Sequence, residues 1–379
     1  MKSFPRRSEK GWTLVELMMT VGIMGLIVPS LTILFTICYQ GLSTSEMHIQ
    51  MKALNEKIHL HLHEQINSSK HMFQNDTTIS GGLNFISRLD MTSAPASVSF
   101  TKMAVQQSGV TSTFSPAAGA VTSNFGDCLF YAAADRSLTI SGVAYVAPLT
   151  ISGASVKDSH NNPCTINLDV YRFYYDYLST TGDQKPIRGV QNYWLIEWQS
   201  VQFVDAFELE DIGTADSTLQ SNVIKALNSG IAATNNRPIT YAWDSSQIAM
   251  TSGTNFAFYT LTSAGGMTGQ AALTIPMQSY TPLTRISSGQ VSNFNYGIPG
   301  NYLQLSSSPP VPQIPKYCYA VTAGAPVSNV FPGGFEVGIE GSNGGMQVLV
   351  RSVLIARGNN KNGYIWDDNT SVSNARDIW

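Results

Sequence analysis

A long apolar run near the N-terminus decides how this chain is organised. Residues 12–38 read WTLVELMMTVGIMGLIVPSLTILFTIC and contain one charged side chain, that of Glu16. A helix over this run is about 40 Å long at 1.5 Å per residue, enough to cross a hydrocarbon layer of about 30 Å. The run therefore predicts a membrane-spanning helix.

The residues before the run form a basic leader, MKSFPRRSEKG, in which four cationic side chains stand against one glutamate. Because basic flanks stay on the cytoplasmic side of a membrane, we expect a cytoplasmic N-terminus and export of residues 40–379. A secretory signal peptide would have a shorter apolar run ending at an A-x-A-like site. Here Gly11 stands before the run instead, so a protease on the cytoplasmic side could cut there and leave the apolar segment in place.

Residues 11–18, GWTLVELM, resemble the class III signal of type IV prepilins and type II secretion pseudopilins. The resemblance implies that a prepilin peptidase cleaves between Gly11 and Trp12 and methylates the new N-terminus at Trp12. Glu16 matches the fifth-position glutamate of that family. This chain departs from the family in two ways: Trp12 replaces the usual phenylalanine, and Pro29 lies a turn earlier than the helix proline of many major pilins.

A carboxylate inside a membrane span is costly and indicates a function that involves a partner. The resemblance implies that Glu16 serves subunit assembly by pairing with the N-terminal amine of a neighbouring subunit, which exists only after cleavage. Such a pair would neutralise both charges in an apolar filament core and fix the register of the subunits. The alternative is that Glu16, five residues past Gly11, only reaches the membrane interface.

Gly22, Gly25 and Pro29 mark a candidate helix hinge. Pro29 has no N–H to donate to the carbonyl of Gly25, so a kink or a meltable stretch is expected over 22–29. Helices of the resembled family melt locally near this point in assembled filaments. A harmless kink in a membrane helix is an equally good interpretation.

After Gly41 the chain becomes amphipathic. Apolar side chains recur every three or four residues, at Met47, Met51, Leu54, Ile58, Leu62 and Ile66. This spacing predicts that the helix continues to about residue 72. His59 and His63 are four residues apart, a pattern that can bind zinc. Because no third and fourth ligand can be named, a polar helix flank is the preferred interpretation, and no metal site is assigned.

Residues 75–379 are predicted to form an exported β-rich head, since short β-rich runs alternate with Gly, Ser, Asn and Pro clusters. One helix is expected at 217–229, with Asp216 as N-cap and Gly230 just after its end. The fold class is therefore α+β: a long N-terminal membrane-spanning helix followed by a β-rich head, pilin-like by resemblance. The strand candidates are 97–104, 127–132, 165–177, 192–205, 237–243, 256–262, 301–305, 316–322, 335–340 and 346–356.

Two features of the head invite a binding interpretation. Aromatic side chains are concentrated in 171–177 and 193–203. They could stack on sugar rings, but core packing is preferred because aromatic residues favour strands. Asp367, Asp368 and Asn369 could contribute to a calcium site, and some pseudopilins bind calcium. The spacing of an EF-hand is absent, however, and no cofactor is expected.

Composition narrows the function classes. Charged residues make up 12% of the chain and its net charge is −3, which argues against a phosphate-backbone binder, so no nucleic-acid partner is expected. We find no Walker loop, GxGxxG, HExxH or GxSxG motif, and we expect no enzymatic activity. If the head is exported, one disulfide and one free thiol are expected among Cys128, Cys164 and Cys318, and nothing selects among the three pairs.

The chain thus divides into a leader peptide at 1–11, a transmembrane and filament-core helix at 12–38, its amphipathic continuation at 39–74 and an exported head at 75–379. The leading hypothesis is a structural minor pilin or pseudopilin of a type IV pilus-like or type II secretion filament. The head is faintly similar to the larger subunits of the J and W kind.

This hypothesis carries expectations about location and partners. We expect a single-pass protein of the inner membrane with its head in the periplasm or at the cell surface, later incorporated in a filament. The partners would be prepilin peptidase, other pilin or pseudopilin subunits, an inner-membrane assembly platform and, before assembly, membrane lipid. A second hypothesis is an adhesin, or a carbohydrate- or surface-binding protein, on a pilin-type stalk. A third is a membrane-anchored enzyme that keeps residues 1–11.

Overall fold

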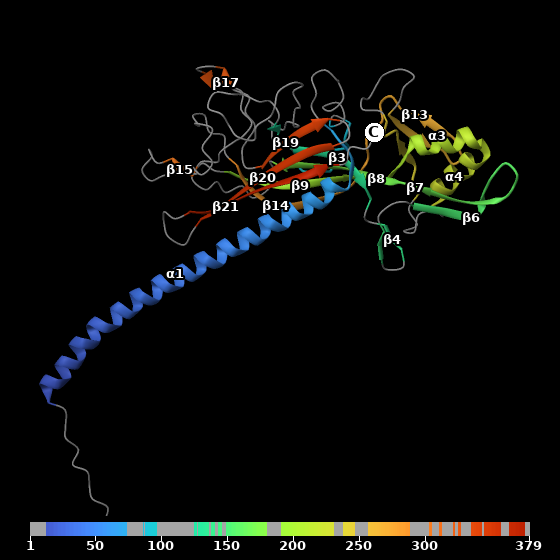
Figure 1. Ribbon diagram of the computed structural model, residues 1–379. Coiled ribbons are helices and arrows are strands. Elements are labelled where there is room, and N and C mark those ends of the chain that lie inside the picture. The colour runs from blue at the N-terminus through green and yellow to red at the C-terminus, as the bar shows by residue number, and fades with distance from the viewer. Residues whose placement is uncertain are drawn as a thin grey trace, which may run out of the picture.

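The structure is a computed structural model, and it shows a long helix that projects from a β-rich head (Figure 1). The residues that it describes are 13–73, 86, 88–96, 125–126, 128–135, 138–140, 143–145, 149–179, 191–230, 238–246, 257–288, 303–304, 311–312, 321–322, 325–326, 335–342, 345–357 and 364–375. The predicted strand at 97–104 lies outside these residues, as do Gly11 and Trp12.

Helix α1 (Leu14–Asn67) is unbroken over 54 residues. It ends five residues before the predicted end at about residue 72, and the next residues form strand β1 (Ser69–Met72). The hydroxyls of Ser68 and Ser69 donate to the carbonyls of Gln65 and Ile66 at 2.9 and 2.6 Å. These bonds occupy carbonyls of the last helical turn and help the chain leave the helix, a competition that hydropathy spacing does not reveal.

A nine-stranded sheet forms the centre of the head. Strand β8 pairs with β3 on one edge and with both β9 and β10 on the other, all antiparallel. Among the described strands of this sheet, β10 and β11 are the pair that runs parallel, and they are joined through helices α3 and α4. The elements of this sheet and its crossover are β1, β3 (Cys128–Ala134), β8 (Val170–Ser179), β9 (Gln191–Ser200), β10 (Phe203–Asp205), α3 (Ala206–Ala215), α4 (Ser217–Ser229), β11 (Tyr241–Trp243), β12 (Phe258–Leu261), β13 (Met267–Gly269) and β14 (Met277–Ser288).

A second antiparallel sheet runs in the order β2-β19-β20-β21 and lies beside the last turns of α1 (Figure 1). Its strands are β2 (Phe125–Gly126), β19 (Phe335–Ser342), β20 (Gly345–Arg357) and β21 (Tyr364–Ala375). The remaining strands pair two by two, as β4 (Leu138–Ile140) with β5 (Val143–Tyr145), β6 (Leu149–Lys157) with β7 (Pro163–Leu168), β15 (Leu303–Gln304) with β16 (Val311–Pro312), and β17 (Val321–Thr322) with β18 (Ala325–Pro326).

Three apolar clusters hold these layers together. The first joins Ile58, Leu62 and Ile66 of α1 to one face of the large sheet and to the inner side chains of β19 and β20. The second covers the opposite face of the large sheet and is mostly aromatic. The third lies between the β6–β7 hairpin, α3 and α4. The docked part of α1 is therefore one wall of the main core, and burying these three side chains stabilises the contact by several kcal/mol, at about 1.5–3 kcal/mol each.

The structure confirms part of the sequence-based assignment of the head. Helix α4 has the predicted bounds, with Asp216 as N-cap and Gly230 in the left-handed conformation at φ 74°. The predicted strand at 165–177 is two strands that break at Asp169. Helix α3 and strands β6, β14 and β21 were not predicted. The aromatic strands pack in the core as preferred, since Tyr171, Tyr175, Tyr177 and Trp198 are all buried.

Candidate functional site

The first candidate site is the half of α1 that has no contact with the head. From Leu14 to Ile49 its large apolar side chains are mostly exposed, including Leu14 at 75% and Phe35 at 70%. Among the described residues α1 is the one helix long and apolar enough to cross a membrane. An apolar surface of this extent is stable only against lipid or other protein, so this half of α1 is an interaction surface.

Glu16 lies in the first turn of this helix and forms a capping box with Thr13. Its carboxylate accepts from the Thr13 backbone N–H at 3.0 Å and from the Thr13 hydroxyl at 3.1 Å. In return the Glu16 N–H donates to the Thr13 hydroxyl oxygen at 3.3 Å. This second role was not predicted from the sequence, although a threonine three residues before a glutamate is the usual signal for a capping box. Glu16 thus has a local partner within the chain before any other subunit is considered.

The candidate hinge at Gly22, Gly25 and Pro29 lies within unbroken helix. A Cβ built on either glycine meets nothing within 4 Å, so no contact in the described part of the chain requires a glycine there. Hydroxyls of neighbouring residues donate to carbonyls one turn back, such as Ser30 to Leu26 at 2.8 Å, and such bonds tend to bend a helix. Figure 1 shows α1 gently bowed rather than kinked. A local melting at this point therefore stays a prediction about the assembled state.

A polar seam fastens the other half of α1 to strands β20 and β21. Asn55 donates to Asp367 at 2.7 Å and accepts from Ser352. The two ring nitrogens of His59 lie 2.6 and 2.7 Å from the hydroxyls of Ser371 and Ser352. One turn later, His63 lies 2.8 Å from the hydroxyl of Ser373. The helix residues are four apart and the partners on β21 are two or four apart, so one face of each element meets the other.

This seam accounts for the histidines that suggested zinc. His59 is buried, and burial lowers the pKa of its ring to about 4, although Asp368 and Asp367 act in the opposite direction. His63 is shared between Ser373 and Asn67. Among the described residues no group of three His, Cys, Asp or Glu side chains is arranged to hold a metal ion.

The candidate calcium residues are also engaged within the chain. Asp367 accepts from Asn55, and Asp368 accepts two hydrogen bonds of 2.9 Å from the guanidinium of Arg351, which is 1% exposed. Asn369 lies opposite Ser352 in the β20–β21 register. A paired and hydrogen-bonded guanidinium satisfies the buried charge of Arg351. The arrangement serves the β20–β21 pair and does not resemble an open cation site.

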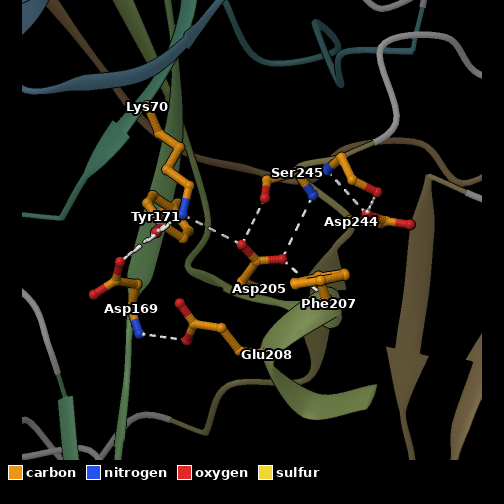
Figure 2. Close-up of polar contacts among 9 residues, drawn as sticks. Lys70, Asp169, Tyr171, Asp205, Phe207, Glu208, Asp244 and Ser245 are labelled. Carbon is orange, nitrogen blue, oxygen red and sulfur yellow. Dashed lines mark hydrogen bonds and ion pairs between the residues drawn. The ribbon is translucent and has the colours of Figure 1, made fainter. Parts of the chain in front are cut away.

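A second polar cluster lies where β1, β8, α3 and β11 meet (Figure 2). Lys70, just after α1, donates to the Tyr171 hydroxyl at 2.9 Å and lies 3.5 Å from the Asp205 carboxylate. The Tyr171 hydroxyl donates in turn to Asp169 at 2.6 Å. Asp205 caps α3 through the N–H of Phe207 at 3.0 Å.

Carboxylates crowd this cluster. Burial raises the pKa of Glu208 to about 7, and the negative charges of Asp169 and Asp205 add to this shift. The hydrogen bond from the backbone N–H of Asp169 and the positive charge of Lys70 act in the opposite direction. Asp205 also accepts from the hydroxyl of Ser245 at 2.6 Å, next to Asp244 at the end of β11. Each carboxylate named here has a donor, so the cluster ties the end of α1 to the α3–α4 lobe and is a structural network.

The structure bears on part of the predicted disulfide pairing. Cys164 is a free thiol, so neither pairing that includes it is present in this structure. Cys128 is buried in β3. Cys318 lies outside the described residues.

The chain was compared with protein-family models, with curated proteins and with solved structures, and none of them matches it.

Proposed function

We propose that this protein is a structural minor pilin or pseudopilin, processed at Gly11-Trp12 and assembled through α1 into a type IV pilus-like or type II secretion filament. The observation that carries the proposal is the length of apolar helix left without a partner. Helix α1 has 54 residues, of which those from Leu14 to Ile49 lie outside the apolar clusters of the head, whereas about 20 suffice to cross a bilayer. The surplus fits a helix that leaves the membrane to pack among other helices.

An outward-facing stripe on α1 supports assembly with other subunits. Beyond the span of a membrane, Leu42, Ile49 and Leu60 remain 71%, 66% and 60% exposed. Their spacings of seven and eleven residues put them on one helix face, at 3.6 residues per turn. Ile58 and Leu62, which pack on the head, lie on the opposite face. This part of α1, beyond the bilayer, is therefore apolar on two opposite faces. Such a helix is suited to bind the head with one face and other subunits with the opposite face.

The partners follow from this proposal. Prepilin peptidase would remove the leader, an inner-membrane assembly platform would extract the subunit from the lipid, and neighbouring subunits would cover the exposed helix. The head would lie in the periplasm or at the cell surface. No enzymatic role and no cofactor form part of the proposal.

The mature N-terminus tests the proposal directly. Mass spectrometry of the protein from its native membrane should find a chain that begins at a methylated Trp12. Gly11→Leu should accumulate as the full-length precursor, because the peptidase would lose the small residue at its cleavage site. As a control, Lys2→Gln leaves the glycine intact and should be processed. A wild-type chain that begins at Met1 would rule out the assignment.

The orientation of α1 gives an independent test. The basic leader predicts a cytoplasmic N-terminus and an exported head. A reporter that is active only outside the cytoplasm, fused after Trp379, should therefore be active, and a reporter restricted to the cytoplasm should be silent there. Activity of the cytoplasmic reporter would contradict the predicted topology.

A further inference from the structure

Two buried carboxyl groups lie side by side on the large sheet. Asp176 on β8 and Glu197 on β9 are cross-strand partners, and their exposed fractions are 0% and 2%. Side chains alternate along a strand, so Asp176 lies on the same face as Tyr174 and Leu178. These two side chains pack in the cluster that includes Ile58 and Leu62, so the carboxyl pair lies on the sheet face against which α1, β19 and β20 pack.

Glu197 has a donor for each of its oxygens. Gln199 donates to one at 2.6 Å, and His61 Nε2 lies 2.6 Å from the other. His61 comes from α1, and its side chain is 37% exposed. The contact of Glu197 with His61 links the sheet to the helix and to solvent.

Asp176 differs sharply from its neighbour. Neither of its carboxylate oxygens has a hydrogen-bond partner among the described residues, and the same holds for the buried hydroxyl of Tyr131. Burial raises the pKa of Asp176 well above its usual range, the charge of Glu197 raises it further, and the Tyr131 hydroxyl acts weakly in the other direction. An ionised carboxylate in such surroundings is very unfavourable, since it is fully buried and faces a like charge.

No cation in the described part of the head is placed to neutralise Asp176. The titratable groups that face it are Glu197 from β9 and Tyr131 from β3. Arg172, on the same face of β8, is committed to Asp135 at 3.0 Å and to the Ser200 carbonyl at 2.7 Å. From α1, His61 faces Glu197.

We propose that Asp176 is a proton-binding site, a neutral carboxylic acid beside an ionised Glu197 at neutral pH, and that this pair is a pH-sensitive latch under α1. While Asp176 holds its proton, the pair carries one negative charge, and His61 lies 2.6 Å from the Glu197 carboxylate. Loss of the proton places two negative charges in an apolar interface. Helix α1 reaches the pair through His61, so this end of α1 is the element that we expect to lift and admit water.

The sign of the pH dependence follows from linkage. A carboxyl group with a raised pKa in the folded state binds a proton on folding, so its contribution is most favourable below its ordinary pKa of 3.8 and is lost as pH rises. Each pH unit in that range lowers the folding equilibrium constant about tenfold relative to a residue that cannot ionise. Asparagine has the shape of the neutral acid and lacks the titration.

The experiment compares Asp176→Asn with wild type in the full-length chain in detergent micelles. Unfolding is followed from pH 4 to pH 9. The two proteins should be equally stable at pH 4, and the variant should become more stable than wild type by about tenfold per pH unit above that. The infrared carbonyl band of a neutral carboxylic acid should be present in wild type at pH 7 and absent in the variant. Asp211→Asn, at an exposed position on α3, is the matched control and should change neither readout.

Each outcome decides the proposal. An Asp176→Asn variant that fails to fold, or that is less stable than wild type at pH 7 with the infrared band unchanged, would show that Asp176 is ionised and needed as a charge. The latch is tested by hydrogen exchange at pH 9, where residues 55–67 should exchange faster in wild type than in Asp176→Asn and equally fast at pH 5. Equal exchange in the two proteins at pH 9 would be consistent with Asp176 as a proton-binding site but would overturn the proposal that the pair acts as a latch on α1.

Discussion

Replacing Glu16 by alanine should leave membrane insertion and leader cleavage intact but lower incorporation into filaments by about 100-fold or more. On the proposed function, Glu16 pairs with the amine of Trp12 of a neighbouring subunit in an apolar filament core. Removing one partner of a buried ion pair costs about 3–5 kcal/mol, because the other charge is left without compensation. At 1.4 kcal/mol per tenfold, about 3 kcal/mol already corresponds to the expected loss.

The capping box makes it necessary to separate two roles of the same carboxylate. Glu16 also accepts from the backbone and hydroxyl of Thr13. Glutamine at this position preserves a capping box but carries no charge. Thr13→Ala retains the charge and loses the cap, at a cost of about 1 kcal/mol. If the intersubunit pair dominates, Glu16→Gln should assemble as poorly as Glu16→Ala, whereas Thr13→Ala should assemble nearly normally.

The measurement is the amount of each variant that co-purifies with sheared filaments, relative to its amount in the membrane. Glu16→Asp, one methylene shorter, should fall between wild type and alanine. The opposite ranking, with Glu16→Gln normal and Thr13→Ala defective, would assign the residue to the helix cap. A normal level of Glu16→Ala in filaments would leave the carboxylate without an assembly role.

The helices show what can and cannot be predicted from the sequence. Helix α4 was predicted with its correct ends, because Asp216 and Gly230 give local signals at both termini. The same kind of signal was present for α3, where Asp205 and Glu208 occupy the N-cap and third positions. It was overlooked because the preceding residues read as a continuous strand. Local capping residues therefore predict helix ends well, provided that a segment is tested both as a strand and as the start of a helix.

The contacts between α1 and the head could not be predicted in the same way. The stripe through Ile58, Leu62 and Ile66 correctly identified the buried face, but Leu54 is 42% exposed and Asn55 is buried in its place. Asn55 is buried because Ser352 and Asp367 meet its amide, and these residues are about 300 positions away in the sequence. Hydropathy spacing reports apolar burial and gives no information about partners so distant.

The acid pair under α1 was missed for a related reason. Asp176 and Glu197 stand within the two aromatic strands, where the aromatic side chains drew attention to the opposite face of the sheet. The alternation of side chains does place Asp176 with Tyr174 and Leu178. That Glu197 lies directly across from it depends on the β8–β9 register, with residues 180–190 between the strands, and no turn signal fixes that register.

Acidification from pH 6.5 to about pH 4 should weaken the docking of α1 through His59. Burial lowers the pKa of this ring to about 4 from an ordinary value of 6.5. A histidine with a depressed pKa in the folded state stabilises the protein above the ordinary value, and this contribution is lost as pH falls through the window between the two values. The difference of about 2.5 units corresponds to about 3 kcal/mol at most, which is a large part of the stability of a small domain.

A variant that lacks His59 alone isolates this effect from all other acid titrations. His59→Gln can still form hydrogen bonds with Ser352 or Ser371 but cannot take up a proton in this range, so its unfolding free energy should fall less steeply than that of wild type between pH 6.5 and pH 4. His48→Gln, at an exposed position on the projecting half of α1, should follow the wild-type curve. Parallel curves for wild type and His59→Gln would mean that the seam opens before His59 is protonated. The loss of stability at low pH would then come from the protonation of other groups. The buried imidazole of His59 would stabilise the docked helix through its hydrogen bonds alone.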